Sequence, residues 1–192
     1  MKCARALTVG AILVAWTAPP ATGQPLQERW PACLACHGEN GQSQNPEVPS
    51  LGGQPAFYVT VQLLMFRDRM RVSEPMNSMT QGLSDDDLRK LADLVSKLPA
   101  PQPIADALDP ARAERARVLI QRNRCNICHR PNFSGEENAP RLAGQREDYL
   151  LKSLRGYKDN TRRGYDTQMA DVVEPLGDAD FTELAAFLTR AR

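Results

Sequence analysis

The chain is short of histidine, of net charge and of strand-like patterns. Only two histidines occur in 192 residues, and the formal net charge is +1. A near-neutral chain lacks the basic surface that nucleic acids require, so nucleic-acid binding is not predicted. No alternation of apolar and polar residues is long enough for a strand, whereas apolar residues recur at helical spacing. The sequence therefore predicts an all-α fold.

The sequence also lacks a long apolar run, and the apolar run near the N-terminus is short. Basic residues precede an apolar run at 6–16 and small residues follow it, which is the plan of a secretory signal peptide. A membrane span needs about 20 apolar residues. We therefore predict a signal peptide at 1–23, cleaved after Gly23 or after Ala21, and export to the periplasm with no membrane insertion of the mature chain. A retained membrane anchor is the alternative.

Spare cysteines are absent as well. Removing residues 1–23 takes away Cys3, and the four cysteines that remain all lie in two copies of one motif. The motif is C-x-x-C-H, and it also contains both histidines of the chain: Cys33, Cys36 and His37, then Cys125, Cys128 and His129.

The motif belongs to an internal repeat. Residues 48–68 match 139–159 at an offset of 91, and residues 76–98 match 169–191 at an offset of 93. The sequence thus contains two copies of a unit of about 80 residues. Such a unit has little core of its own and often needs a cofactor to stabilise it.

The repeat sets the expected domain organisation. We predict an N-terminal domain at 24–98, a proline-rich linker at 99–109 and a C-terminal domain at 110–192, because the prolines of the linker cannot continue a helix. Helical spacing and cap residues predict five helices, at 55–69, 84–97, 110–124, 146–158 and 178–190.

A C-x-x-C-H run is the attachment signature of c-type haem. Cysteines at i and i+3 lie about one helical turn apart, so both thiols reach one edge of a porphyrin and the next histidine falls below the iron. Three alternatives fit worse. A zinc site needs its cysteine pairs closer together, a thioredoxin-like dithiol needs a βαβ unit, and disulfides leave the histidines unexplained. The sequence predicts two covalently attached haem c groups.

The second axial ligand follows by elimination. Both histidines are already used and no cysteine is spare, so methionine is the remaining strong ligand. Met169 is the only methionine of the second unit and lies seven residues before Leu176. The equivalent position before Leu83 is Met76, with Met79 as the alternative. We predict axial pairs of His37 with Met76 and of His129 with Met169.

Each unit resembles a class I c-type cytochrome in its order of motifs. C-x-x-C-H is followed by P-x-L-x-G-Q and a tyrosine, then by methionine, then by a last helix that opens with L-[SG]-D. Two such units in one exported chain resemble the di-haem cytochrome c4 family over residues 30–192. The resemblance implies two tandem class I cytochrome c-like domains packed face to face. It also implies that the carbonyl groups of Pro49 and Pro140 accept a hydrogen bond from the proximal imidazoles. The alternative, to which we give equal weight, is that each proline only forms a turn.

Two departures from the family pattern stand out. Pro31 interrupts the segment before Cys33, so we expect a cramped first helix there and a well-formed one before Cys125. Gly38 follows the first histidine, whereas Arg130 follows the second. Arg130 either lies near a haem propionate or is a solvated surface residue.

With both axial positions filled, neither iron has a vacant site for a substrate. The sequence therefore predicts an electron carrier rather than an enzyme, with each iron cycling between Fe(III) and Fe(II). Redox proteins are the expected partners, namely an upstream quinol-oxidising complex or dehydrogenase and a downstream oxidase or reductase. The alternatives are a di-haem enzyme of peroxidase or thiosulfate-oxidising type, and an electron-transfer subunit of a dehydrogenase or oxidase complex.

The substitution Met169→His tests the ligand assignment. It should keep the second haem attached but lower its reduction potential, because imidazole favours the ferrous iron less than a thioether does. A redox titration that resolves the two haems measures the effect. An unchanged potential for the second haem would rule out Met169 as its ligand.

Overall fold

The computed structural model describes residues 26–162 and 167–192, and within them the chain is entirely helical. The predicted signal peptide lies outside this part of the chain. The described helices are α1 Leu26–His37, α2 Ala56–Arg67, α3 Glu74–Thr80, α4 Asp85–Lys97, α5 Pro110–Arg122, α6 Cys125–Cys128, α7 Glu147–Lys158, α8 Gln168–Val173 and α9 Asp178–Leu188. The all-α prediction is confirmed.

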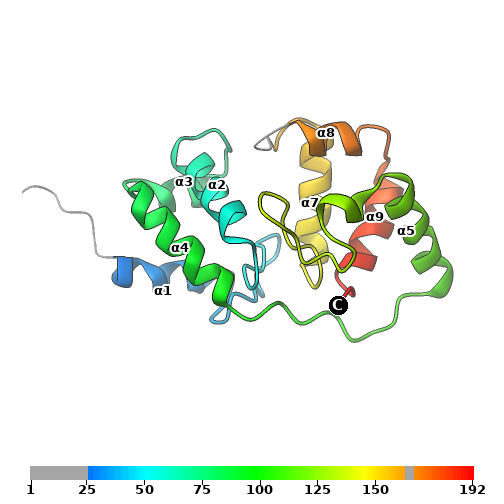
Figure 1. The fold of residues 1–192 in the computed structure, drawn as a ribbon, viewed down its shortest axis with the longest axis horizontal. Coiled ribbons are helices and arrows are strands. Elements are labelled where there is room, and N and C mark those ends of the chain that lie inside the picture. The colour runs from blue at the N-terminus through cyan, green and yellow to red at the C-terminus, as the bar shows by residue number, and fades with distance from the viewer. Residues whose placement is uncertain (1–25, 163–166) are drawn as a thin grey trace, which may run out of the picture.

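The helices form two groups that lie side by side (Figure 1). In the first group α2 packs against α4 and α3 packs against α2. In the second group α9 packs against both α5 and α7, and α8 packs against α7. All five helices predicted from the sequence agree with α2, α4, α5, α7 and α9 to within two residues at each end.

The two groups differ in how their cores are built. The second has one continuous cluster, which includes Ile120, Leu150 and Phe181. The first has two smaller clusters, one around Val59 and Val95 and the other around Leu83, Leu88 and Leu91. Divided apolar clusters of this size favour a domain that is completed by a cofactor.

The expected interruption at Pro31 is wrong, because α1 continues through this residue to His37. Packing supplies the reason. Leu26 and Trp30 of α1 pack against the cluster around Leu88, and the Arg29 guanidinium donates to the main-chain oxygen of Met79 at 2.7 Å. These tertiary contacts outweigh the one helical hydrogen bond that a proline removes.

The helix before the second motif is broken instead. α5 ends at Arg122, and Arg124 has a positive φ of 54° before the single turn of α6 begins at Cys125. The well-formed helix expected before Cys125 is present as α5, although it ends two residues earlier than expected. The two motifs reach their histidines by different backbone paths, one continuous and one bent.

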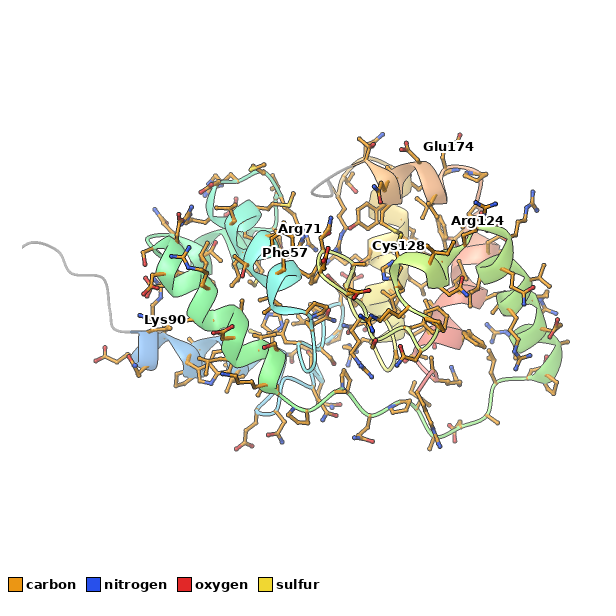
Figure 2. The ribbon with its side chains drawn as sticks, viewed as in Figure 1. Phe57, Arg71, Lys90, Arg124, Cys128 and Glu174 are labelled. Atoms are coloured by element: carbon orange, nitrogen blue, oxygen red, sulfur yellow. The ribbon has the colours of Figure 1, made fainter. Side chains whose placement is uncertain are left out.

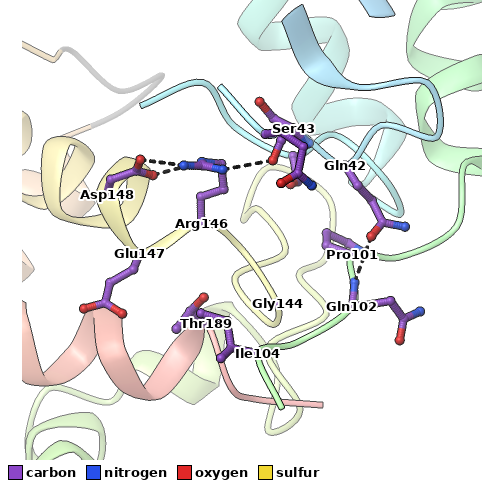
Figure 3. A pocket seen from close by; sticks show the side chains of 12 residues that line it. Gln42, Ser43, Pro101, Gln102, Ile104, Gly144, Arg146, Glu147, Asp148 and Thr189 are labelled. Atoms are coloured by element: carbon purple, nitrogen blue, oxygen red, sulfur yellow. Dashed lines mark hydrogen bonds and ion pairs between the residues drawn. The ribbon is translucent and has the colours of Figure 1, made fainter. Parts of the chain in front are cut away.

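Residues 99–109 run along the two groups without forming a helix (Figure 1). Their main chain is held on both sides: Gln102 N–H donates to the Gln42 side chain at 3.3 Å, and Ile104 N–H donates to Thr189 O at 3.1 Å. A cavity of about 430 Å³ lies beside this segment. Figure 3 shows Arg146 on its rim, bridging Ser43 O and Asp148.

The N-terminus of α4 provides a test of local stability. Ser84 Oγ accepts from Asp87 N–H at 3.1 Å, and the Asp87 carboxylate accepts from Ser84 N–H at 3.0 Å. Ser84→Ala should lower the free energy of unfolding by about 1 kcal/mol, because helix N–H groups lose their cap. Denaturant unfolding measures this. Ser96→Ala, at a half-buried position near the other end of the same helix, is the control, and equal effects of the two changes would contradict the capping role.

Candidate haem sites

His37 is the last residue of α1 and its side chain is buried. Its Nδ1 atom lies 2.9 Å from Pro49 O. A carbonyl oxygen can only accept, so Nδ1 carries the proton and the lone pair of the imidazole is on Nε2. Burial lowers the pKa of His37 and outweighs the carbonyl bond, which raises it. The result is a neutral, oriented imidazole with Nε2 able to bind iron.

His129 reproduces this arrangement in the second group. It follows α6, is buried, and places Nδ1 at 2.8 Å from Pro140 O. Burial again lowers its pKa against the opposing effect of the carbonyl. The contact that the family resemblance implied between each imidazole and a proline carbonyl is confirmed in both halves.

The turn after each histidine needs a positive φ. Gly38 has φ +85°, and a Cβ there would lie 2.2 Å from Gln42 O, so only glycine fits. Arg130 has φ 67°, which an L-residue adopts at some cost. Its exposed guanidinium pairs with Glu136. Of the two readings of Arg130, the surface residue is the one that the structure supports.

The four motif cysteines are free thiols with a repeated pattern of exposure. Cys33 and Cys125 are half-buried, and Cys36 and Cys128 are exposed. Burial is the main effect that raises the pKa of Cys33 and of Cys125. In each pair the two thiols come from one helical turn that ends at the histidine, as attachment along one edge of a porphyrin requires.

The candidate methionines lie on two short helices in matching places. Met76 and Met79 are on α3, Met169 is on α8, and all three are half-buried. Met169 packs against the core cluster of the second half. Of the other two methionines in the first domain, Met65 is buried in α2 and Met70 is exposed after it.

Arginines without acidic partners gather where the two halves meet. Arg162 donates to Tyr58 OH at 3.2 Å and to Tyr149 OH at 2.9 Å, and Arg71 reaches Tyr149 OH at 3.4 Å (Figure 2 shows Arg71 between the halves). Arg141 lies at the same boundary. Within the described residues none of these three guanidinium groups pairs with a carboxylate, and Nε of Arg141 and of Arg162 is buried without a hydrogen bond.

The pKa of a tyrosine at this boundary reflects the same excess of positive charge. Burial acts to raise the pKa of Tyr149, but the charges of Arg162 and Arg71 outweigh it and lower that pKa to about 6. In Tyr58 burial dominates and raises the pKa to about 12. A half-buried cluster with this imbalance favours an anionic ligand.

These donors fit haem c. Paired thiols suit the two thioether bonds, a neutral imidazole suits the iron, and unpaired guanidinium groups suit the propionate carboxylates. The role of these three arginines was not predicted from the sequence, although the repeat contains a signal for two of them. Arg71 and Arg162 are 91 residues apart, which is the offset of the repeat between Tyr58 and Tyr149.

Comparisons with known proteins agree with this fit. A family model described as cytochrome c matches residues 113–191. The chain is 30% identical to cytochrome c4 of Thiocapsa roseopersicina, with 81% of this chain and 85% of the relative covered. It is 32% identical to the thiosulfate dehydrogenase electron acceptor of Thiomonas intermedia, with 83% and 78% covered. The crystal structure of reduced recombinant cytochrome c4 from Pseudomonas stutzeri matches with a TM-score of 0.78 and 28% identity, over 87% of this chain and 97% of that chain.

The site and these likenesses define the class as a c-type cytochrome, an electron-transfer protein with covalently bound haem c. The duplication narrows the class to di-haem proteins built from two class I cytochrome c domains. Within it, the chain belongs to the cytochrome c4 family. No helix in the part of the chain that the structure describes has the length and apolar character to cross a membrane.

Replacing Arg162 by glutamine tests the charge argument. A buried positive charge stabilises ferrous haem relative to ferric, so Arg162→Gln should lower the reduction potential of at least one haem. Redox titration measures the shift. Arg122→Gln, an exposed change at the end of α5, is the control. Equal potentials in wild type and Arg162→Gln would contradict the placement of this charge near a haem.

Proposed function

We propose that this protein is a periplasmic di-haem electron carrier whose two irons are both closed to substrates. The duplicated contact of a buried imidazole with a proline carbonyl carries the proposal, because it prepares one neutral imidazole in each half. The signal-peptide pattern at 1–23 supports the periplasmic location. We assign the domains to 24–98 and 110–192, with 99–109 as the linker.

In this proposal the thiols of Cys33, Cys36, Cys125 and Cys128 hold the haem groups covalently, and two histidine–methionine pairs complete the irons: His37 with Met76, and His129 with Met169. When bound, the haem groups supply one-electron chemistry between Fe(III) and Fe(II). The repeat supports Met76 over Met79, because Met76 stands where Met169 stands in the second unit.

The side chains around each iron set its reduction potential. Each imidazole donates its Nδ1–H to a proline carbonyl, which fixes the ring and raises its basicity. The methionine thioether favours the reduced iron, and the apolar clusters limit access of water. Arg71, Arg141 and Arg162 compensate the propionate charges. Transfer to another protein then needs only a brief encounter.

The partners follow from these properties. An electron carrier with filled axial positions exchanges electrons with an upstream dehydrogenase or quinol-oxidising complex and with a downstream oxidase or reductase. A relative at 32% identity is named a thiosulfate dehydrogenase electron acceptor. That name supports a thiosulfate-oxidising dehydrogenase as the donor, with this chain as the acceptor rather than as the enzyme.

Carbon monoxide tests the proposal, since it binds ferrous haem only where an axial position is open. The reduced wild type should bind none rapidly, and Met76→Leu should bind one equivalent at the first haem. Met79→Leu lies on the same helix and is the matched control, which should bind none. The visible absorption spectrum measures binding.

Rapid binding by the wild type would favour the alternative of a di-haem enzyme with an open iron. If Met79→Leu opened the first haem and Met76→Leu did not, the carrier function would stand and the axial assignment would move to Met79.

A further inference from the structure

Two buried glutamines cross between the halves in a reciprocal arrangement. Gln145 of the second half accepts from Ser50 N–H through Oε1 and donates to Ser50 O through Nε2, both at 2.8 Å. Gln54 of the first half accepts from Arg141 N–H at 2.9 Å and donates to Arg141 O at 3.0 Å. Gln54, Gln145 and Ser50 are each less than 5% exposed.

Each glutamine contacts the peptide group that holds an imidazole. Ser50 follows Pro49, so the N–H that Gln145 binds and the carbonyl that His37 binds belong to one peptide unit. The same holds for Arg141 and Pro140. One hydrogen-bonded chain therefore runs from His37 through the peptide 49–50 to Gln145, and a second runs from His129 through the peptide 140–141 to Gln54.

A peptide group transmits polarisation between its two ends. When an acceptor binds the N–H, electron density on the carbonyl oxygen rises, and in a buried site neighbouring hydrogen bonds strengthen each other. The carbonyl then accepts more strongly from Nδ1–H, which makes the imidazole more basic. A more basic imidazole stabilises ferric iron, so the glutamine lowers the reduction potential of the haem at the far end of the chain.

The contacts do not depend on the side chain of the residue that is bound. Ser50 and Arg141 differ in size and charge, yet each glutamine binds only main-chain N–H and C=O groups. Both ends of the side-chain amide are used, and this holds the loop whose proline carbonyl binds the imidazole in register against the other half. The arrangement is therefore tied to the packing of the two halves.

We propose that Gln145 and Gln54 are crossed positioning residues, each of which sets the orientation and basicity of the proximal imidazole in the opposite half. The reduction potential of each haem then depends on the other domain being docked. The proposal rests on the function above, in which His37 and His129 are the proximal ligands.

Potentials of two variants give the main test. Gln145→Leu should raise the potential of the first haem more than that of the second, and Gln54→Leu should do the opposite. The haem whose potential moves in Met169→His identifies the second haem. Lys152→Gln is the matched control, because it breaks the exposed ion pair with Glu47 between the halves and leaves both peptides untouched. Its effect on the two potentials should be small and equal.

Nuclear magnetic resonance of the reduced protein, with isotope-labelled histidine, gives a second readout. In Gln145→Leu the Nδ1–H proton of His37 should move upfield, and that of His129 should stay in place. If the leucine variant does not fold, Gln145→Glu serves instead, since its carboxylate keeps the acceptor for Ser50 N–H. The His37 proton should then stay in place or move downfield.

The outcomes separate the two proposals. Shifts confined to the haem of the mutated half, or equal shifts at both haems, would overturn the crossed arrangement while the carrier function stands. The crossed arrangement would also be overturned if neither glutamine variant shifted the potential of the opposite haem while methionine stayed bound in every variant. If either histidine of the wild type gave no Nδ1–H signal, this would instead contradict the ligand assignment on which both proposals rest.

Discussion

Each half of this protein depends on one hydrogen bond, from a buried imidazole to a proline carbonyl 12 residues away in the first half and 11 in the second. The bond fixes which nitrogen carries the proton and so leaves the other one for iron. It also closes a short loop after the C-x-x-C-H turn, whose own helical geometry places the thiols beside the imidazole. The final helices and their apolar clusters pack around that loop.

The boundary between the halves is polar, although both halves have apolar cores. Glutamine amides bind main-chain groups across it, and arginines meet tyrosines there without carboxylates in the described residues. Buried cations are costly unless anions compensate them. The boundary therefore fits a protein whose two cofactors bring carboxylates to the same place, and it links the docking of the domains to the electrostatics of both irons.

The helical fold and most helix ends could be predicted from the sequence, because the repeat allowed equivalent segments of the two units to be compared. The prediction failed at Pro31 and Arg124. In the first case tertiary contacts of Leu26, Trp30 and Arg29 outweigh the local preference against proline. The roles of Gln54 and Gln145 could not be predicted, because their partners lie 87 and 95 residues away and are main-chain groups. The P-x-L-x-G-Q motif places a glutamine at the same position in both units, but it does not show what that glutamine contacts.

In the proposed protein a histidine and a methionine close each of two haem groups, with one pair in each half. The most direct measurement is a redox titration that resolves both haems while the far-red methionine–iron absorption band of the ferric protein is followed. We expect two one-electron steps, each of which removes about half of the band. A step that leaves the band unchanged would mean a haem without methionine, and would rule out histidine–methionine ligation at that haem.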